Sequence, residues 1–275
     1  MTKYQKQVSI APYYLSLTRN NFPLSGHPEG EPRRLKGKNM TIPSILEMLQ
    51  AGVHFGHQTS RWHPKMKDFI YTDRNNIHVI DLEKTRAELE IVLPQIKKMA
   101  AEGKVILFVS TKPQAREIVK AAAMDCGMPF LTDRWLGGML TNFAEIKKLV
   151  KKYNTLKEEQ ATGELEKYTK KEQLDIAKEL EKMDIYLGGI AKLDKLPDAL
   201  FLPAMQREKT AVMEANRMHV PIIAVCDTNA NPLKADWVIP ANDDAVNAIK
   251  MIVNLVAEAV KEGKAEAEKN KGEVK

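Results

Sequence analysis

The chain has few cysteines, few aromatic residues and no long apolar segment. Its 275 residues include only Cys126 and Cys226, which lie far apart in the sequence, so a disulfide framework is excluded and a reducing compartment is indicated. No apolar run reaches the roughly 18 residues that a membrane-spanning helix requires, so we expect no membrane partner. Since 44% of the residues are apolar, wholesale disorder is also excluded, and the length predicts one large domain or two small ones.

The positive charge is concentrated at the N-terminal end. The formal net charge is +6; residues 1–39 carry seven basic and two acidic side chains, which accounts for five of these charges, and the remaining 35 basic and 34 acidic side chains leave one. A basic protein often binds nucleic acid or an anionic surface. Because the body of this chain is nearly neutral, any RNA binding by the body requires a local basic patch.

Residues 1–39 are predicted to be a basic, flexible extension. They contain several prolines and glycines, no acidic residue before Glu29 and no lasting apolar period. No apolar segment follows the early lysines, so we do not expect a secretory signal. Three interpretations remain open: an arm that orders on RNA, a cleaved organellar transit peptide, and a translation start at Met40.

From Pro43 onward, amphipathic helices alternate with short, unbroken apolar runs of the kind found in strands covered on both faces. This alternation implies parallel strands joined by right-handed crossovers. We therefore predict an α/β fold, a three-layer sandwich with a mainly parallel sheet, whose body comprises residues 40–143 and 185–262. The expected strands are 69–71, 77–80, 105–109, 198–202, 221–225 and 237–239, and the expected helices are 45–53, 82–103, 113–126, 208–219 and 243–262.

Residues 144–184 form a different kind of segment. They contain no proline, one glycine and ten basic against ten acidic side chains, with apolar residues at three- and four-residue spacing on both sides of Gly163. Two narrow apolar seams around a break predict a protruding antiparallel helical hairpin of coiled-coil type. A solvated helix pair without a partner is the alternative. Residues 263–275 are predicted to be a disordered, charged tail.

The phosphate-binding signatures of nucleotide enzymes are missing. No G-x-x-x-x-G-K-[ST] and no G-x-G-x-x-G follows any expected strand. Ser110-Thr111-Lys112 lies where a strand ends and a helix begins, so an anion could bind there. Asp243-Asp244 is better explained as the cap of the last helix than as a catalytic pair. We therefore expect no catalytic residues and no cofactor.

Three histidines lie close together in the sequence, and their spacing could suit zinc. They are His54, His57 and His63. A structural zinc site normally has four ligands, and neither cysteine is near in sequence, so we expect no metal site. We expect one imidazole to pack under the first helix and another to face a phosphate or solvent.

The richest candidate for chemistry is a basic segment with an aromatic residue inside it. Arg61-Trp62-His63-Pro64-Lys65-Met66-Lys67 places four potential cations around an indole, and Arg74 follows in a turn. Arg and Lys bind phosphates, while Trp and Arg stack on exposed bases. The alternative is a basic loop whose Trp fills the core. On these residues alone, RNA binding is only weakly supported.

Several stretches resemble the bacterial form of small ribosomal subunit protein two. They begin at Leu46 (LEMLQAGVHFGHQTSRWHPKM), Ile77 (IHVIDLEKT), Arg134 (RWLGGMLTNF), Leu196 (LPDALF), Val220 (VPIIAVCDTNANP) and Val238 (VIPANDDA). The resemblance covers residues 40–262 and implies a non-enzymatic structural protein that binds ribosomal RNA on the solvent side, near the head–body junction of the small subunit. It also implies that the protein helps to hold the mRNA-binding ribosomal protein one. We expect the ribosome to be cytoplasmic, with an organellar ribosome as a minor alternative, and we expect no homo-oligomer.

The RNA contacts that we predict are Arg61, Trp62, His63, Lys65, Lys67, Arg74, Lys112 and Arg134. The competing interpretation is a small-molecule-binding α/β enzyme that shares the fold. One departure from the family pattern lies after LPDALF, where a further apolar residue and Asp are usual and this chain has Pro203-Ala204. Proline cannot donate to a sheet ladder, so the strand should end before Pro203, and no role of the missing acid carries over.

Overall fold

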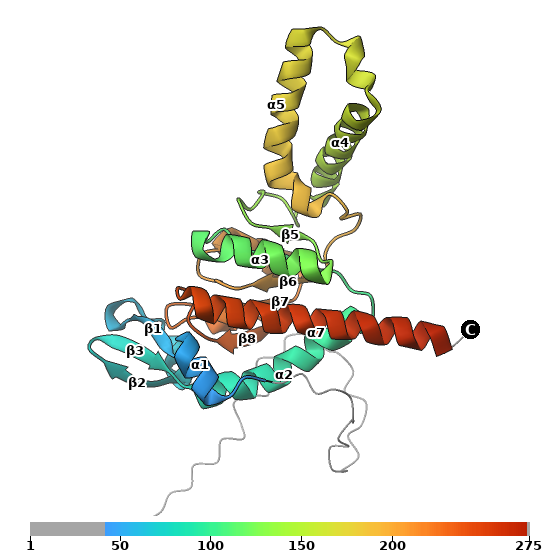
Figure 1. The fold of residues 1–275 in the computed structure, drawn as a ribbon. Helices are drawn as coiled ribbons and strands as arrows, with labels where there is room; N and C mark the ends of the chain where they lie inside the picture. Colours follow the sequence, from blue (N-terminus) through green and yellow to red (C-terminus); the bar gives the residue numbers. More distant parts are fainter. Residues whose placement is uncertain (1–41, 274–275) are drawn as a thin grey trace, which may run out of the picture. The chain divides into compact units, whose positions relative to one another are not determined.

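Two sheets of different kinds organise residues 42–273, which are the residues that this computed structural model describes. Five strands form a parallel sheet in the order β5-β4-β6-β7-β8, and three form an antiparallel sheet in the order β1-β3-β2 (Figure 1). The strands are β1 (Phe55–Gln58), β2 (Ile70–Arg74), β3 (Ile77–Ile80), β4 (Ile106–Val109), β5 (Phe130–Leu131), β6 (Ala199–Leu202), β7 (Ile222–Cys226) and β8 (Trp237–Pro240).

Helices connect the strands. They are α1 (Ile45–Ala51), α2 (Leu82–Ala101), α3 (Pro113–Cys126), α4 (Phe143–Thr162), α5 (Lys170–Leu187), α6 (Lys209–Met218) and α7 (Val246–Glu273), with 3-10 turns η1 (Thr59–Arg61), η2 (Pro64–Phe69), η3 (Glu164–Lys167), η4 (Gly188–Ile190) and η5 (Pro232–Lys234). Their ends follow local chemistry: Ser44 and Glu47 form a capping box on α1, and Asp81 caps α2. None of these helices is both long and apolar enough to cross a membrane.

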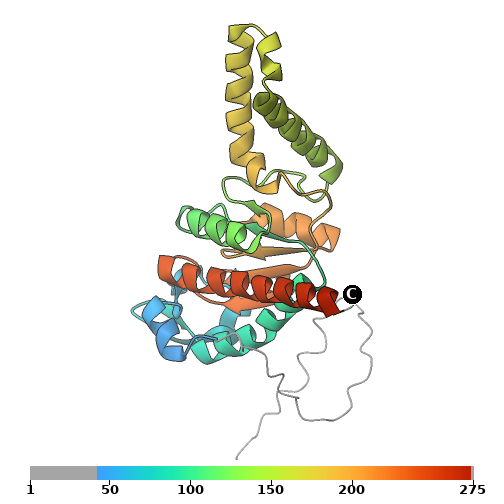
Figure 2. The same cartoon turned by 45° about the vertical axis from the view of Figure 1, so that its right-hand side comes forward.

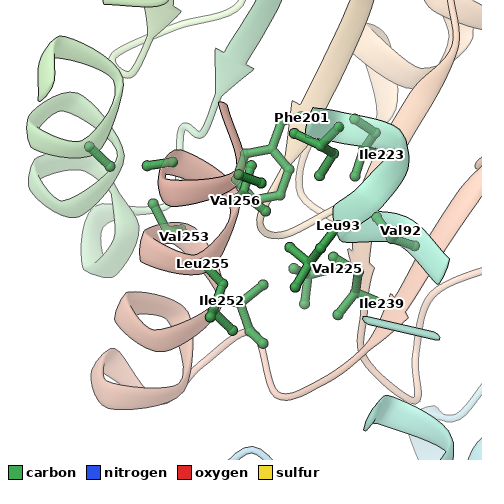
Figure 3. Packing of buried hydrophobic residues seen from close by; sticks show 14 of the residues in the cluster. Val92, Leu93, Phe201, Ile223, Val225, Ile239, Ile252, Val253, Leu255 and Val256 are labelled. Carbon is green, nitrogen blue, oxygen red and sulfur yellow. The ribbon is translucent and has the colours of Figure 1, made fainter. Parts of the chain in front are cut away.

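Alternate residues of the parallel strands enter two separate cores. Ile106 and Phe108 pack with α2, α3 and α7, whereas Leu107 and Val109 pack with α6 and the base of α4 and α5. Figure 3 shows part of the first core, in which the α2 side chains Val92 and Leu93 lie close to strand residues such as Val225 and Ile239, with the apolar side chains of α7 beside them. Burial on both faces explains the unbroken apolar runs, and the predicted three-layer α/β sandwich is confirmed.

The small antiparallel sheet is fixed to the carboxyl ends of β7 and β8. The backbone N–H of His57 donates to Oγ1 of Thr228 over 2.8 Å, and the N–H of Asn242 donates to the Val53 carbonyl over 3.0 Å. At Gly56 a Cβ would come within 2.6 Å of the Thr228 side chain, so only glycine permits this approach. The segment that precedes the predicted basic loop is therefore held on the body.

The segment with two apolar seams folds as two helices, α4 and α5, which lie side by side (Figures 1 and 2). Gly163 ends α4 at a φ of 79°, which agrees with the predicted break. Tyr153 is fully buried and its hydroxyl donates to Asp184 of α5. The base of the pair belongs to the second core, since Ile146 and Leu187 are buried there.

Three sequence expectations on the fold need correction or fall outside the structure. Strands β1 and β5 were not predicted. The last helix does not end at residue 262, because α7 continues to Glu273 through a segment rich in Ala, Glu and Lys, which are good helix formers. The predicted extension of residues 1–39 lies outside the described residues. As predicted, β6 ends before Pro203.

Candidate nucleic-acid interface

The predicted basic loop, Arg61 to Lys67, has a fixed backbone. It is built from the turns η1 and η2. The N–H of His63 donates to the Thr228 carbonyl over 2.8 Å, and Nδ1 of His63 accepts from the N–H of Lys65 over 3.2 Å. Met66 is fully buried in the second core. The half-buried His63 and the fully buried Met66 thus anchor this loop, and its remaining side chains are exposed.

Trp62 does not fill the core. Its side chain is 37% exposed, and its ring lies against His78 with the ring centroids 5.4 Å apart. Met66 takes the buried position that the alternative interpretation gave to this indole. An aromatic face held at the surface beside cations is suited to stacking on an unpaired base.

Arg74 lies next to the basic loop. It ends β2, where Asn75 and Asn76 form the turn to β3 at φ values of 52° and 60°, a conformation that asparagine tolerates. The N–H of Thr59 donates to the Asn76 carbonyl over 2.9 Å and joins this turn to η1. We call the exposed side chains of Arg61, Trp62, Lys65, Lys67 and Arg74 the basic surface.

The cations of the basic surface are unpaired. No described carboxylate forms an ion pair or hydrogen bond with Arg61, Lys65, Lys67 or Arg74, whereas Lys97, for example, is paired with Glu266. An unpaired guanidinium or ammonium at the surface keeps its full charge for an external phosphate.

Lys112 has a different environment. Its Nζ lies 2.8 Å from Oδ1 of Asp243 and 2.6 Å from Oδ1 of Asp244, with only 13% of the side chain exposed. Burial would lower the pKa of Lys112, but the two carboxylates raise it above its usual value. This ammonium is neutralised inside the protein, so we leave Lys112 out of the basic surface.

Asp243 and Asp244 are not the helix cap that we expected. The helix α7 begins at Val246, and the turn that leads into it is held by Asn242, whose Oδ1 accepts from the N–H groups of Asp244 and Ala245 over 2.8 and 3.3 Å. Asp243 is buried instead, and burial together with the nearby Asp227 raises its pKa. Both acids pair with Lys112 instead.

The three sequence-adjacent histidines do not form one site. In the described residues, the side chains that could jointly hold a metal ion are His57, Asp227 and Asp243, whose ligand atoms lie within 4.8 Å of one another. Nδ1 of His57 is 3.1 Å from Asp227, and this contact raises the pKa of His57 against the effect of burial. One imidazole and two carboxylates suit a divalent cation. Sequence reasoning missed this group because Asp227 is distant in the chain.

The anion position expected at Ser110-Thr111-Lys112 is filled by the protein itself. Oε1 of Glu208 accepts from the N–H and the hydroxyl of Thr111 over 2.6 and 2.8 Å. Glu208 is 3% exposed, and burial raises its pKa even though Thr111 donates to it. An external phosphate would have to displace a buried side chain, which removes the main structural argument for a nucleotide enzyme.

Comparison with known proteins agrees with this geometry. Residues 48–263 match the family model of ribosomal protein S2. The small ribosomal subunit protein uS2 of Coprothermobacter proteolyticus is 46% identical over 225 residues, which are 82% of this chain and 84% of the relative. The chain belongs to the ribosomal protein S2 family.

As a member of the S2 family, the chain is a structural, non-enzymatic protein of the small ribosomal subunit. Its location is the ribosome, and association with ribosomal RNA and other ribosomal proteins follows from the family. The enzyme interpretation is thereby excluded.

Arg134, the last predicted RNA contact of this S2-family chain, lies apart from the basic loop in sequence and fold. It is exposed, and it precedes a loop that Glu214 of α6 holds in place. The Glu214 carboxylate accepts from Nε1 of Trp135 over 3.0 Å and from the N–H groups of Gly138 and Leu140 over 2.9 and 3.0 Å. Glu214 was missed in the sequence, although an acid among buried alanines on α6 is a recognisable signal.

Proposed function

We propose that this S2-family protein binds ribosomal RNA through its basic surface, on the solvent side of the small subunit near the head–body junction. The observation that carries the proposal is an anchored loop that presents an exposed indole and three unpaired cations, with the unpaired Arg74 at the end of the neighbouring strand β2. Because the body as a whole is nearly neutral, this local set supplies phosphate contacts that bulk charge does not. We further propose that this ribosome is cytoplasmic and that the protein acts as a monomer.

We also propose that the protein helps to recruit the mRNA-binding ribosomal protein one where the organism has it. Family membership supports this role. Immobilised small subunits that contain this protein should retain ribosomal protein one during a salt wash. Subunits that lack it should lose ribosomal protein one in the same wash. Equal retention by both would contradict the proposal without affecting RNA binding.

The RNA-binding proposal is tested by charge reversal. In the variant Arg61→Glu, Lys65→Glu, Lys67→Glu, incorporation into small subunits should fall and the salt dependence of RNA binding should weaken by roughly one unit of slope per lost phosphate contact. Reversal of the exposed Lys98, Lys120 and Lys250, which lie on other helices, is the matched control. If the two triple variants behave alike, the basic surface is wrongly assigned.

A further inference from the structure

A polar hollow lies at the carboxyl edge of the parallel sheet. β4 has β5 on one side and β6 on the other, so the strand order reverses there, and ligands of open α/β sheets bind at such points. Residues that follow these three strands line a hollow of about 290 Å³. They include Thr111 after β4, Arg134 and Trp135 after β5, and Arg207 after β6.

Three guanidinium groups line this hollow, and two of them are free. Arg116 is fixed, since it donates to the carbonyls of Thr111 and Asp133 over 3.2 Å each and lies 3.4 Å from Oδ1 of Asp133. Arg134 and Arg207 are exposed, and their guanidinium groups make no hydrogen bond or ion pair with any residue that the structure describes. Two guanidinium groups therefore lie at the hollow without a direct ion pair, although the charge of Arg207 acts on the nearby Glu208 carboxylate.

The acids of the hollow already have partners. Asp133 is bound by Arg116, and Glu208 accepts from Thr111. Trp135 is held by Glu214. The wall is thus fixed before any ligand arrives and has excess positive charge, as a preorganised oxyanion site requires.

We propose that this hollow holds a backbone phosphate of ribosomal RNA, with Arg134 and Arg207 as ligands and the Thr210 hydroxyl as a neutral donor. The proposal rests on the proposed RNA binding and gives the RNA a second point of attachment beside the basic surface. Paired guanidiniums match phosphate geometry. The size of the hollow is at the lower limit for pockets that enclose whole ligands, and Trp135 is only 8% exposed, so no ring is offered for a base to stack on.

Binding of the full-length chain to intact small-subunit ribosomal RNA between about 50 and 200 mM salt tests the proposal. In the double variant Arg134→Ala, Arg207→Ala, the slope of log affinity against log salt should become less steep by about one unit. The loss of affinity over that range should then be roughly fourfold smaller than for the unmodified chain. Each single variant should give nearly the same decrease, because both side chains hold one phosphate. Arg217→Ala, an exposed arginine at the other end of α6, should leave the slope unchanged.

The result separates the two proposals. If reversal of Arg61, Lys65 and Lys67 lowers the slope while Arg134→Ala, Arg207→Ala does not, the hollow is not an RNA contact and the basic surface stands. If the unmodified chain does not bind the RNA, the proposed function itself fails. Equal melting temperatures of the variants and the unmodified chain exclude loss of folding as the cause.

Fluorine NMR of the 5-fluorotryptophan-labelled chain distinguishes a backbone phosphate from a small ligand. The chain has three tryptophans: Trp135 reports on the hollow, Trp62 on the basic surface, and Trp237 on β8. Millimolar inorganic phosphate, at constant ionic strength, should shift the Trp135 signal, and Arg134→Ala, Arg207→Ala should abolish the shift. AMP should bind no more tightly than phosphate. Absence of the shift, or AMP binding more than about tenfold tighter, would overturn the assignment.

Discussion

At the scale of the residue, two buried glutamates show how hydrogen bonds set the direction in which the pKa of a buried carboxyl shifts. Burial by itself acts to raise the pKa of both Glu208 and Glu214. Glu214 accepts from Trp135 and from several backbone N–H groups, and these donors lower its pKa below the usual value. Glu208 has only the two donors of Thr111, and its pKa remains raised.

The two glutamates should therefore respond oppositely to conversion into glutamine at pH 7. Since the folded-state pKa of Glu214 is lowered, its ionised form stabilises the fold above the unfolded-state pKa and this stability is lost as pH falls through the folded value. Glu214→Gln should lower the free energy of unfolding by about 1–3 kcal/mol. Glu208→Gln should be neutral or stabilising, because it removes the cost of a buried charge. Denaturant titration at pH 7 and in acid checks both, and a more harmful Glu208→Gln would contradict the account.

The sequence did not predict which residues form the cluster around His57. The acid in α6 has a local signal, an ionisable residue on a buried helical face, and could have been found. His57 and Asp227 are brought together only by the packing of β1 against the end of β7, which no local pattern encodes. The expected capping role of Asp243 was wrong because its carboxylate is buried and pairs with Lys112.

At the scale of the element, long or continuous apolar patterns were predictable and short strands were not. The helix α3 and the strands β4, β6 and β7 agree with the pattern to within a residue or two. Strand β1 contains Gly56 and His57, has no apolar alternation, and exists because it pairs with β3 and is bonded to Thr228. Such a strand is stabilised by tertiary contacts rather than by propensity.

The α4–α5 pair should be dispensable at its tip but not at its base. Tyr153 and Leu180 are buried in the second core, whereas the residues between Glu159 and Lys178 are mostly exposed. Replacement of 160–177 by a short Gly-Ser loop should leave the body melting cooperatively within a few degrees of the unmodified protein, whereas replacement of 150–178 should open a cavity and lower stability by about 3 kcal/mol or more. Calorimetry distinguishes them; equal melting of both deletions would show that the base does not contribute to the core.

The contact of α7 with α2 should tolerate no side chain at Gly263. A Cβ there would lie 2.2 Å from the Lys97 carbonyl and 2.8 Å from the Ala100 side chain. Alanine would gain about 1 kcal/mol of helix propensity, but forced separation of the helices costs about 1–3 kcal/mol. Gly263→Ala should therefore lower the unfolding free energy in denaturant titration, while Glu268→Ala on the same helix should not. A stabilised Gly263→Ala would contradict this packing.

At the scale of the whole molecule, the charge that matters is the charge left unpaired. Composition shows that the body is nearly neutral, and the sequence identifies the basic loop as dense in cations. It cannot show that Lys112 is neutralised by Asp243 and Asp244 while Lys65 and Lys67 are free, because this depends on which strand ends meet. The α/β class and the family were thus accessible from the sequence, and the composition of the binding surface was not.

Ultraviolet cross-linking of native small subunits, followed by mass spectrometry of this protein, tests the central claim most directly. Aromatic side chains in contact with bases cross-link efficiently, and Trp62 is the exposed ring of the basic surface. We predict nucleotide adducts on peptides from the segment Arg61 to Arg74, with Trp62 as the principal site. RNA adducts confined to other parts of the chain, with Arg61 to Arg74 unmodified, would contradict the account.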